Sequence, residues 1–193
     1  MSAMIDLREQ ARTHMPAALP GCTELYGAAR ETWLGRMVNE HSSAKVFDGL
    51  AAQVRRAGLA EELARECEGF AAEERRHGIL CGAVVEALGG EALAPAPSQD
   101  AYPEHADAGP VEALLRNVIS ICCLSETVAV ALIGAERLEM PEGPLRDLLT
   151  DIWADEIGHA RFGWALVGRL TPHLSAEVKD RLSAYLVVAL AHL

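Results

Sequence analysis

The amino-acid sequence predicts an all-α protein, with a bundle of four long helices and a fifth helix at the C-terminus. Half of the 193 residues are hydrophobic but only 5% are aromatic, and Ala and Leu are abundant. Long runs without Gly or Pro carry apolar residues at alternating spacings of four and three, which is the period of an amphipathic helix. Segments rich in Gly and Pro separate these runs and predict the helix ends.

Length, charge and cysteine content limit the classes of protein to consider. A chain of 193 residues is long enough for one domain with a sizeable core. We expect an N-terminal segment over residues 1–22 and a single bundle domain over residues 23–193. The net charge of -11 argues against non-specific binding to nucleic acid. The first ten residues contain no apolar run, and the five Cys lack zinc-ribbon spacing, so we expect a cytoplasmic protein with reduced thiols.

The first helix is predicted from Thr23 to about Arg56, because Thr23 can cap its start and Gly58 can end it. Within its apolar stripe, Glu40 is the only charged residue. The stripe consists of Trp33, Met37, Glu40, Ala44, Phe47, Ala51 and Val54. The carboxylate of Glu40 is therefore predicted to point into the bundle.

The second helix is predicted from about Ala60 to Leu88, with Gly89 and Gly90 as the stop. Its only polar stripe members form a Glu-x-x-His pair. The stripe consists of Leu63, Cys67, Phe70, Glu74, His77, Cys81, Val84 and Leu88. Residues 89–110 follow as a long connection with no periodicity, which in a bundle is expected to cross from one helix pair to the other.

The third helix is predicted to begin near Pro110, a residue favoured in the first turn. From Asn117 to Ala135 the only charged residue is Glu126. A membrane span is the alternative interpretation. A carboxylate at the centre of a lone span is costly, however, so we favour a helix buried among other helices. Its inward stripe is expected to be Leu115, Ile119, Cys122, Glu126, Ala129 and Ile133.

The fourth helix is predicted to start at Pro144 and to end at Thr171-Pro172. Its only polar stripe members form the second Glu-x-x-His pair. The stripe consists of Leu145, Leu149, Ile152, Glu156, His159, Gly163, Leu166 and Leu170. Ser175 can cap a fifth helix, whose apolar residues 185–190 are expected to pack across the bundle or against another subunit, as in a homodimer.

The four stripes together predict a metal site at the middle of the bundle. Residues three apart lie on one helix face, so each Glu-x-x-His pair can aim a carboxylate and an imidazole at one point. None of the stripes contains Lys or Arg. Four ionised carboxylates buried without a cation would be very costly, and two divalent ions would balance them. Oxygen and imidazole donors suit two iron ions, or manganese or a mixed Mn/Fe pair, while zinc usually prefers fewer ligands. The predicted ligands are Glu40, Glu74, His77, Glu126, Glu156 and His159.

This ligand order resembles the ferritin-like superfamily of di-iron and di-manganese carboxylate proteins over about residues 25–170. The resemblance implies a ferritin-like four-helix bundle with its long crossover between the second and third helices. It also implies that the four Glu hold two metals, with at least one carboxylate bridging. Asp155 and Glu73 precede the two pairs. By resemblance, Asp155 would hydrogen-bond His77 and Glu73 would reach His159, which fixes the imidazole tautomers.

The first functional hypothesis is a small oxidase or oxygenase that activates dioxygen on an organic substrate. The predicted surroundings of the site are apolar and could hold a small apolar molecule. They comprise Ala44, Phe47, Cys81, Cys122, Ala129 and Ile133. Aldehyde-deformylating oxygenases and small N-oxygenases share this general plan. Such a cycle would need an electron donor, which could be a partner protein, and we expect no nucleic-acid or membrane partner.

Four alternatives remain open at this point. A ferroxidase or iron-storage protein uses the same six ligands in a larger assembly. A peroxide reductase like rubrerythrin has a further ligand Glu where this chain has Ala129. A ribonucleotide reductase small subunit has its radical Tyr where this chain has Cys81, a position that is also Cys in multicomponent monooxygenases. A zinc-filled or empty bundle could instead serve as a structural or interaction module.

Overall fold

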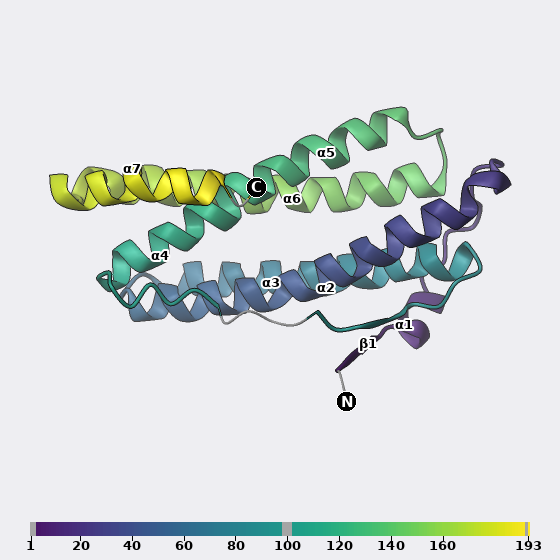
Figure 1. The fold of residues 1–193 in the computed structure, drawn as a ribbon, viewed down its shortest axis with the longest axis horizontal. Helices are drawn as coiled ribbons and strands as arrows, with labels where there is room; N and C mark the ends of the chain where they lie inside the picture. The colour runs from purple at the N-terminus through teal and green to yellow at the C-terminus, as the bar shows by residue number, and fades with distance from the viewer. Residues whose placement is uncertain (1–2, 98–101, 192) are drawn as a thin grey trace.

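The computed structural model describes residues 3–97, 102–191 and 193, and helices make up most of them. The long helices α2 (Tyr26–Arg56) and α3 (Glu61–Ala87) pack side by side as one layer. The second layer contains α4 (Pro110–Val118), the π-helical segment η2 (Ile119–Ser125), α5 (Glu126–Glu139) and α6 (Pro144–Leu170), as Figure 1 shows. After the 3-10 turn η3 (Thr171–His173), α7 (Ala176–Leu190) lies against α4 and η2. The prediction of an all-α protein is confirmed.

Most helix ends lie where the sequence predicts them, for identifiable reasons. Gly58 and Gly89 follow α2 and α3 with φ of 68° and 78°, a left-handed conformation that favours glycine. Pro110 and Pro144 occupy the first turns of α4 and α6. Ser175 caps α7. The start of α2 differs, because residues 23–25 form a separate 3-10 turn, η1 (Thr23–Leu25), before the helix begins.

The N-terminal segment contains more structure than the sequence predicts. Strand β1 (Met4–Asp6) pairs antiparallel with β2 (Leu93–Pro95), and the short helix α1 (Arg8–Arg12) packs on α3. The crossover between the second and third helices, interpreted as lacking regular structure, thus carries a strand. Three-residue strands are too short to show an alternating pattern, and their pairing joins distant segments. Residues 1–2, and 98–101 of the crossover, lie outside the described residues.

The third predicted helix is divided by the π-helical segment η2. A π-helix has more residues per turn than an α-helix, so it rotates the inward stripe relative to a regular 3.6-residue period. Val118 is fully buried, whereas the predicted stripe member Ile119 is only partly buried. Past η2, the stripe returns to Glu126, which is buried as the first residue of α5.

The predicted stripes of the other three long helices form the core. Every member of the first stripe is buried, and so are the members of the second and fourth except the partly buried Leu63, Leu88 and Leu170. Two apolar clusters result, one around Met37 and Ile152 and the other around Phe47 and Leu166. All five cysteines are free thiols, and four of them are buried.

The stretch from Pro110 to Glu139 is long and apolar enough to cross a membrane by length and composition, with a mean hydropathy of 2.1 in its most apolar window. Only 22% of that window is buried, so the prediction that this helix is buried among the other helices was wrong for most of the stretch. The middle of this stretch holds Glu126, whose buried side chain faces the carboxylates of the neighbouring helices.

Candidate metal centre

Four helices bring the six predicted ligands to one place in the interior. Helix α2 contributes Glu40, α3 contributes Glu74 and His77, α5 contributes Glu126, and α6 contributes Glu156 and His159. The two histidines are fully buried, and the four glutamates are at most 8% exposed. Carboxylates are seldom buried this deeply unless a cation or a hydrogen-bond network compensates them.

The six side chains form two overlapping groups of four. One group contains Glu40, Glu74, His77 and Glu156. The other contains Glu74, Glu126, Glu156 and His159. Within each group the donor atoms all lie within 4.8 Å of one another. Glu74 and Glu156 belong to both groups, so these two carboxylates are the candidates to bridge a pair of metal ions.

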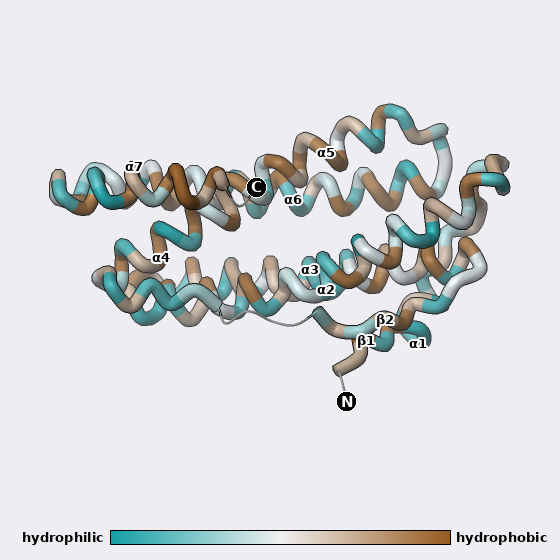
Figure 2. The backbone as a smooth tube through the Cα atoms, in the orientation of Figure 1, coloured by the Kyte–Doolittle hydropathy of each residue, from teal (hydrophilic) through white to brown (hydrophobic). Residues whose placement is uncertain are grey.

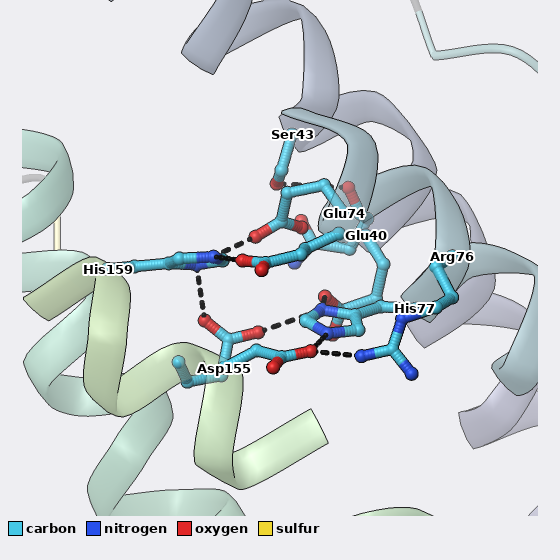
Figure 3. A network of polar contacts seen from close by, with 10 residues as sticks. Glu40, Ser43, Glu74, Arg76, His77, Asp155 and His159 are labelled. Carbon is cyan, nitrogen blue, oxygen red and sulfur yellow. Dashed lines mark hydrogen bonds and ion pairs between the residues drawn. The ribbon is translucent and has the colours of Figure 1, made fainter. Parts of the chain in front are cut away.

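The imidazole of His77 lies between the glutamates and Asp155. Its Nδ1 is 3.1 Å from Glu156 Oε1 and 3.7 Å from Glu40 Oε2, while its Nε2 is 2.9 Å from Asp155 Oδ2. Figure 3 shows Asp155 between His77 and Arg76, which also donates to this carboxylate. A proton on Nε2 that is donated to Asp155 leaves the Nδ1 lone pair directed at the glutamates.

His159 has the equivalent arrangement in the other group. Its Nδ1 lies 3.3 Å from Glu74 Oε1 and 3.2 Å from Glu156 Oε2, and its Nε2 lies 2.9 Å from Glu73 Oε2. The two hydrogen bonds expected by resemblance, from His77 to Asp155 and from His159 to Glu73, are therefore both present. The ring of His159 is also packed by Phe70, at 4.5 Å between ring centroids.

Without metal, the surrounding carboxylates control the protonation of both histidines. Burial by itself would lower the pKa of His77, but the carboxylates of Glu156 and Glu40 beside its Nδ1 raise it to about 10. Burial would likewise lower the pKa of His159, but Glu156 and Glu74 raise it to about 11. The metal-free site therefore holds two imidazolium ions at neutral pH.

The four glutamates respond differently to the same environment. Burial raises the pKa of Glu74 to about 7 and raises the pKa of Glu126 well above its usual range, and in both cases the Glu156 charge adds to the effect. For Glu156, burial acts upward as well, but hydrogen bonds from His159 and His77 hold its pKa below the ordinary value. Protons thus supply part of the charge compensation when metal is absent.

Two buried polar atoms at the centre of the site indicate that a cation would fit there. Glu74 Oε2 and His77 Nδ1 are both buried without a hydrogen-bond partner. Unsatisfied polar atoms are rare in protein interiors, and each is costly. A divalent ion between them would satisfy both atoms at once, and the mixed oxygen and imidazole donor set suits iron or manganese.

Comparison with protein-family models, with curated proteins and with solved structures found no match for this chain. The assignment of a function to this chain therefore depends on its residues and their geometry.

A cavity of about 260 Å³ opens beside the carboxylates, on the side of the site that the histidines do not line. Of the predicted pocket residues, Phe47 and Ala129 line it. The other predicted surroundings do not line this cavity and are buried in the two apolar clusters: Ala44, Cys81, Cys122 and Ile133. They share the stripe of the ligands but lie one or two turns away from them, where neighbouring helices close over the stripe.

The sequence analysis missed the remaining residues that line the cavity. Besides the four glutamates they are Asn39, Ser43, Val46, Ile121 and Ser125. None of them belongs to a predicted stripe, because they flank the inward face at the gap between α2 and η2. Ser43, about one turn after Glu40, and Ser125, directly before Glu126, were the available signal, but such residues are common on solvated helix faces.

Proposed function

We propose that this chain is a ferritin-like di-metal carboxylate protein that uses two iron ions, or manganese or a mixed pair, to oxidise a small organic substrate with dioxygen. The observation that carries the proposal is the pair of four-donor groups sharing Glu74 and Glu156. One Glu from each of two helices and a Glu-x-x-His pair from each of two others is the ligand pattern of that superfamily. The long crossover between α3 and α4 agrees with it.

The surroundings of each histidine support a role in holding metal. Asp155 and Glu73 accept the Nε2 protons, which keeps each Nδ1 free to bind and fixes the ring orientation. Asp155 is itself held by Arg76. Bound iron or manganese would supply the redox chemistry. The residues of the chain hold the ions, balance their charge and shape the adjoining space.

The cavity supports a small substrate with both apolar and polar parts. Phe47, Val46 and Ile121 offer apolar contacts, whereas Asn39 and Ser43 offer neutral hydrogen-bonding groups. The cavity contains no Lys or Arg among its described lining residues, so a substrate recognised through a negative charge is not favoured. An oxygenase cycle would also need electrons from a donor, which we expect to be a separate protein.

A ferroxidase is the second candidate, because the cavity opens toward the surface past polar residues and ends at four carboxylates. Such a path would admit hydrated iron ions as readily as an organic molecule. Ala129, which lines the cavity, supplies no carboxylate where the peroxide reductases have theirs. This reduces support for the peroxide-reductase alternative.

Iron loading separates the two candidates. The metal-free protein is titrated with Fe(II) in the absence of oxygen, exposed to air, and analysed for iron content and particle size. We expect uptake to stop at about two ions per chain, as two four-donor groups allow. Continued uptake to hundreds of ions in a large particle would favour storage, and no uptake of iron or manganese would contradict the proposal altogether.

A further inference from the structure

The outward face of α5 is apolar and exposed. Val128 is 40% exposed and Leu132 is 65% exposed. Ala131 and Ala135 lie beside them and are exposed as well. From residue 127 to residue 135 the chain contains no charged side chain. The inward face of the same helix carries the buried Glu126.

The C-terminal half of α7 extends this apolar face. Ala189 is buried and α7 packs on η2, whereas its neighbours Val187 and Leu190 are 72% and 52% exposed. Trp164 of α6 adds a half-exposed indole that hydrogen-bonds Thr127 at the start of α5. Figure 2 shows hydrophobic residues along the start of α5 and the end of α7. We call the whole set the α5–α7 surface: Val128, Leu132, Leu138, Trp164, Leu186, Val187, Val188 and Leu190.

The α5 part of this surface is unusually apolar for its low burial. In the most apolar window of Pro110–Glu139 only 22% of the residues are buried. Helices with this hydropathy are normally covered on all sides. Contiguous exposed apolar patches beyond a few hundred Å² usually mark interaction sites.

We propose that a second copy of this chain covers the α5–α7 surface and forms a homodimer. A stable interface needs about 800 Å² from each partner. Eight large apolar side chains, exposed by 39% to 72%, can supply an area of that order. Ala131 and Ala135 leave room for another helix to approach α5 closely. The same patch on each copy is self-complementary, as a twofold interface requires.

Charge favours a second copy over a lipid surface. Cytoplasmic membrane leaflets are negatively charged and attract clusters of Lys and Arg. Residues 127–135 of α5 and 182–190 of α7 contain neither residue type, and the chain carries a net charge of -11. An uncharged patch on each copy, in contrast, brings no like charges into the centre of the interface. The partner would cover the outer side of the helix that carries Glu126.

The test is the solution mass of the full chain, measured by analytical ultracentrifugation with and without bound metal. We expect about twice the 20.7 kDa chain mass at micromolar concentration in both states. Leu132→Glu and Val187→Glu should each weaken dimerisation by roughly tenfold or more, because each buries a charge in the interface. Both side chains are mostly exposed in the single chain, so circular dichroism spectra and metal content should remain those of the wild type.

Met4→Glu is the matched control, since Met4 is 52% exposed but lies in β1, on the far side of the α2–α3 layer from α5 and α7 (Figure 1). This variant should dimerise with the same affinity as the wild type. A monomeric wild-type chain across the concentration range would overturn the proposal, and so would unchanged dimerisation of both surface variants. A monomer that sediments with phosphatidylcholine vesicles, and loses this property in Leu132→Glu, would assign the surface to lipid instead. Failure of metal binding would leave these results unaffected.

Discussion

Among the six candidate ligands, Glu74 and Glu156 differ from the others because each belongs to both four-donor groups. We predict that Glu74→Gln removes binding of both ions. Glu40→Gln and Glu126→Gln should each leave about one ion per chain, because each changes a single four-donor group. The measurement is metal content by mass spectrometry after loading with Mn(II), together with the affinity of each variant.

Folding of these variants can be checked without metal. Burial raises the pKa of Glu126 well above its usual range, and Gln has the shape of a protonated Glu. Glu126→Gln should therefore unfold near the wild-type temperature when metal-free, but gain less stability from metal. Two ions bound to Glu74→Gln would contradict the shared position of this carboxylate.

The carboxylate of Asp155 acts on metal through His77. We predict that Asp155→Asn weakens metal binding by roughly 10- to 100-fold, as losses of such orienting hydrogen bonds usually do. Asn can accept one hydrogen bond, but it lacks the charge that makes the imidazole a stronger donor to metal. Calorimetric titration with Mn(II) would measure the change.

Asp48→Asn is a suitable control for this substitution. Asp48 pairs with Arg75 at 2.5 Å, and Arg75 is the neighbour of Arg76 in sequence. Both variants thus remove one carboxylate from an arginine on α3, but only Asp155 contacts a candidate ligand. Equal losses of affinity in the two variants would assign the effect to general electrostatics instead.

At the level of elements, the close packing of α6 on η2 determines where Glu126 lies. A Cβ at Gly163 would be 2.5 Å from Cys122 Cβ and 3.0 Å from the Cys123 backbone nitrogen. We predict that Gly163→Ala destabilises the chain by about 1–3 kcal/mol, as overpacking commonly does. It should also lower the affinity for a metal ion at the four-donor group that contains Glu126 and His159, because the π-helical turn must shift. Thermal unfolding and metal titration are the measurements.

Gly168→Ala in the same helix separates packing from helix propensity. A Cβ at Gly168 would meet nothing within 4 Å. This variant should be neutral or slightly stabilising, since Ala favours a helix more than Gly does. If Gly163→Ala were equally harmless, the contact between α6 and η2 would not determine the position of Glu126.

For the whole molecule, metal binding and proton release should be coupled. The pKa values of His77 and His159, about 10 and 11, lie above the ordinary 6.5. In the metal-free chain their stabilisation is fully present below pH 6.5 and is lost as pH rises through 10 to 11. A metal ion at each Nδ1 must displace a proton, and the raised pKa values of Glu74 and Glu126 add carboxyl protons that metal would also displace. Affinity should therefore increase with pH, with at least two protons released per chain near pH 7.

Titration with Mn(II) in two buffers of different ionisation enthalpy would count these protons. The metal-free chain should also lose stability toward pH 10, whereas the loaded chain should retain it, because metal has replaced the protons. Binding that released no protons and did not vary between pH 6 and 8 would contradict the assignment of both histidines as ligands.

The sequence by itself determined most of the helices and the set of candidate ligands. Helical periodicity is local, so stripes such as the one through Met37, Glu40 and Ala44 can be read without knowing the neighbouring helices. The spacing of Glu74 and His77 likewise fixes that they share a face. Because these stripes contain no Lys or Arg, the negative charge of their buried carboxylates must be balanced by a cation or by protons.

Only the tertiary structure decided how these stripes meet. It distinguished Glu74 and Glu156 from the other ligands, because sharing depends on the distances between helices. It replaced Cys122 by Ile121 as a cavity residue, since the π-helical turn rotates the third helix by an amount that no pattern of apolar residues encodes. The pairing of β1 with β2 and the exposed α5–α7 surface also depend on contacts between distant segments, and a local period carries no information about such contacts.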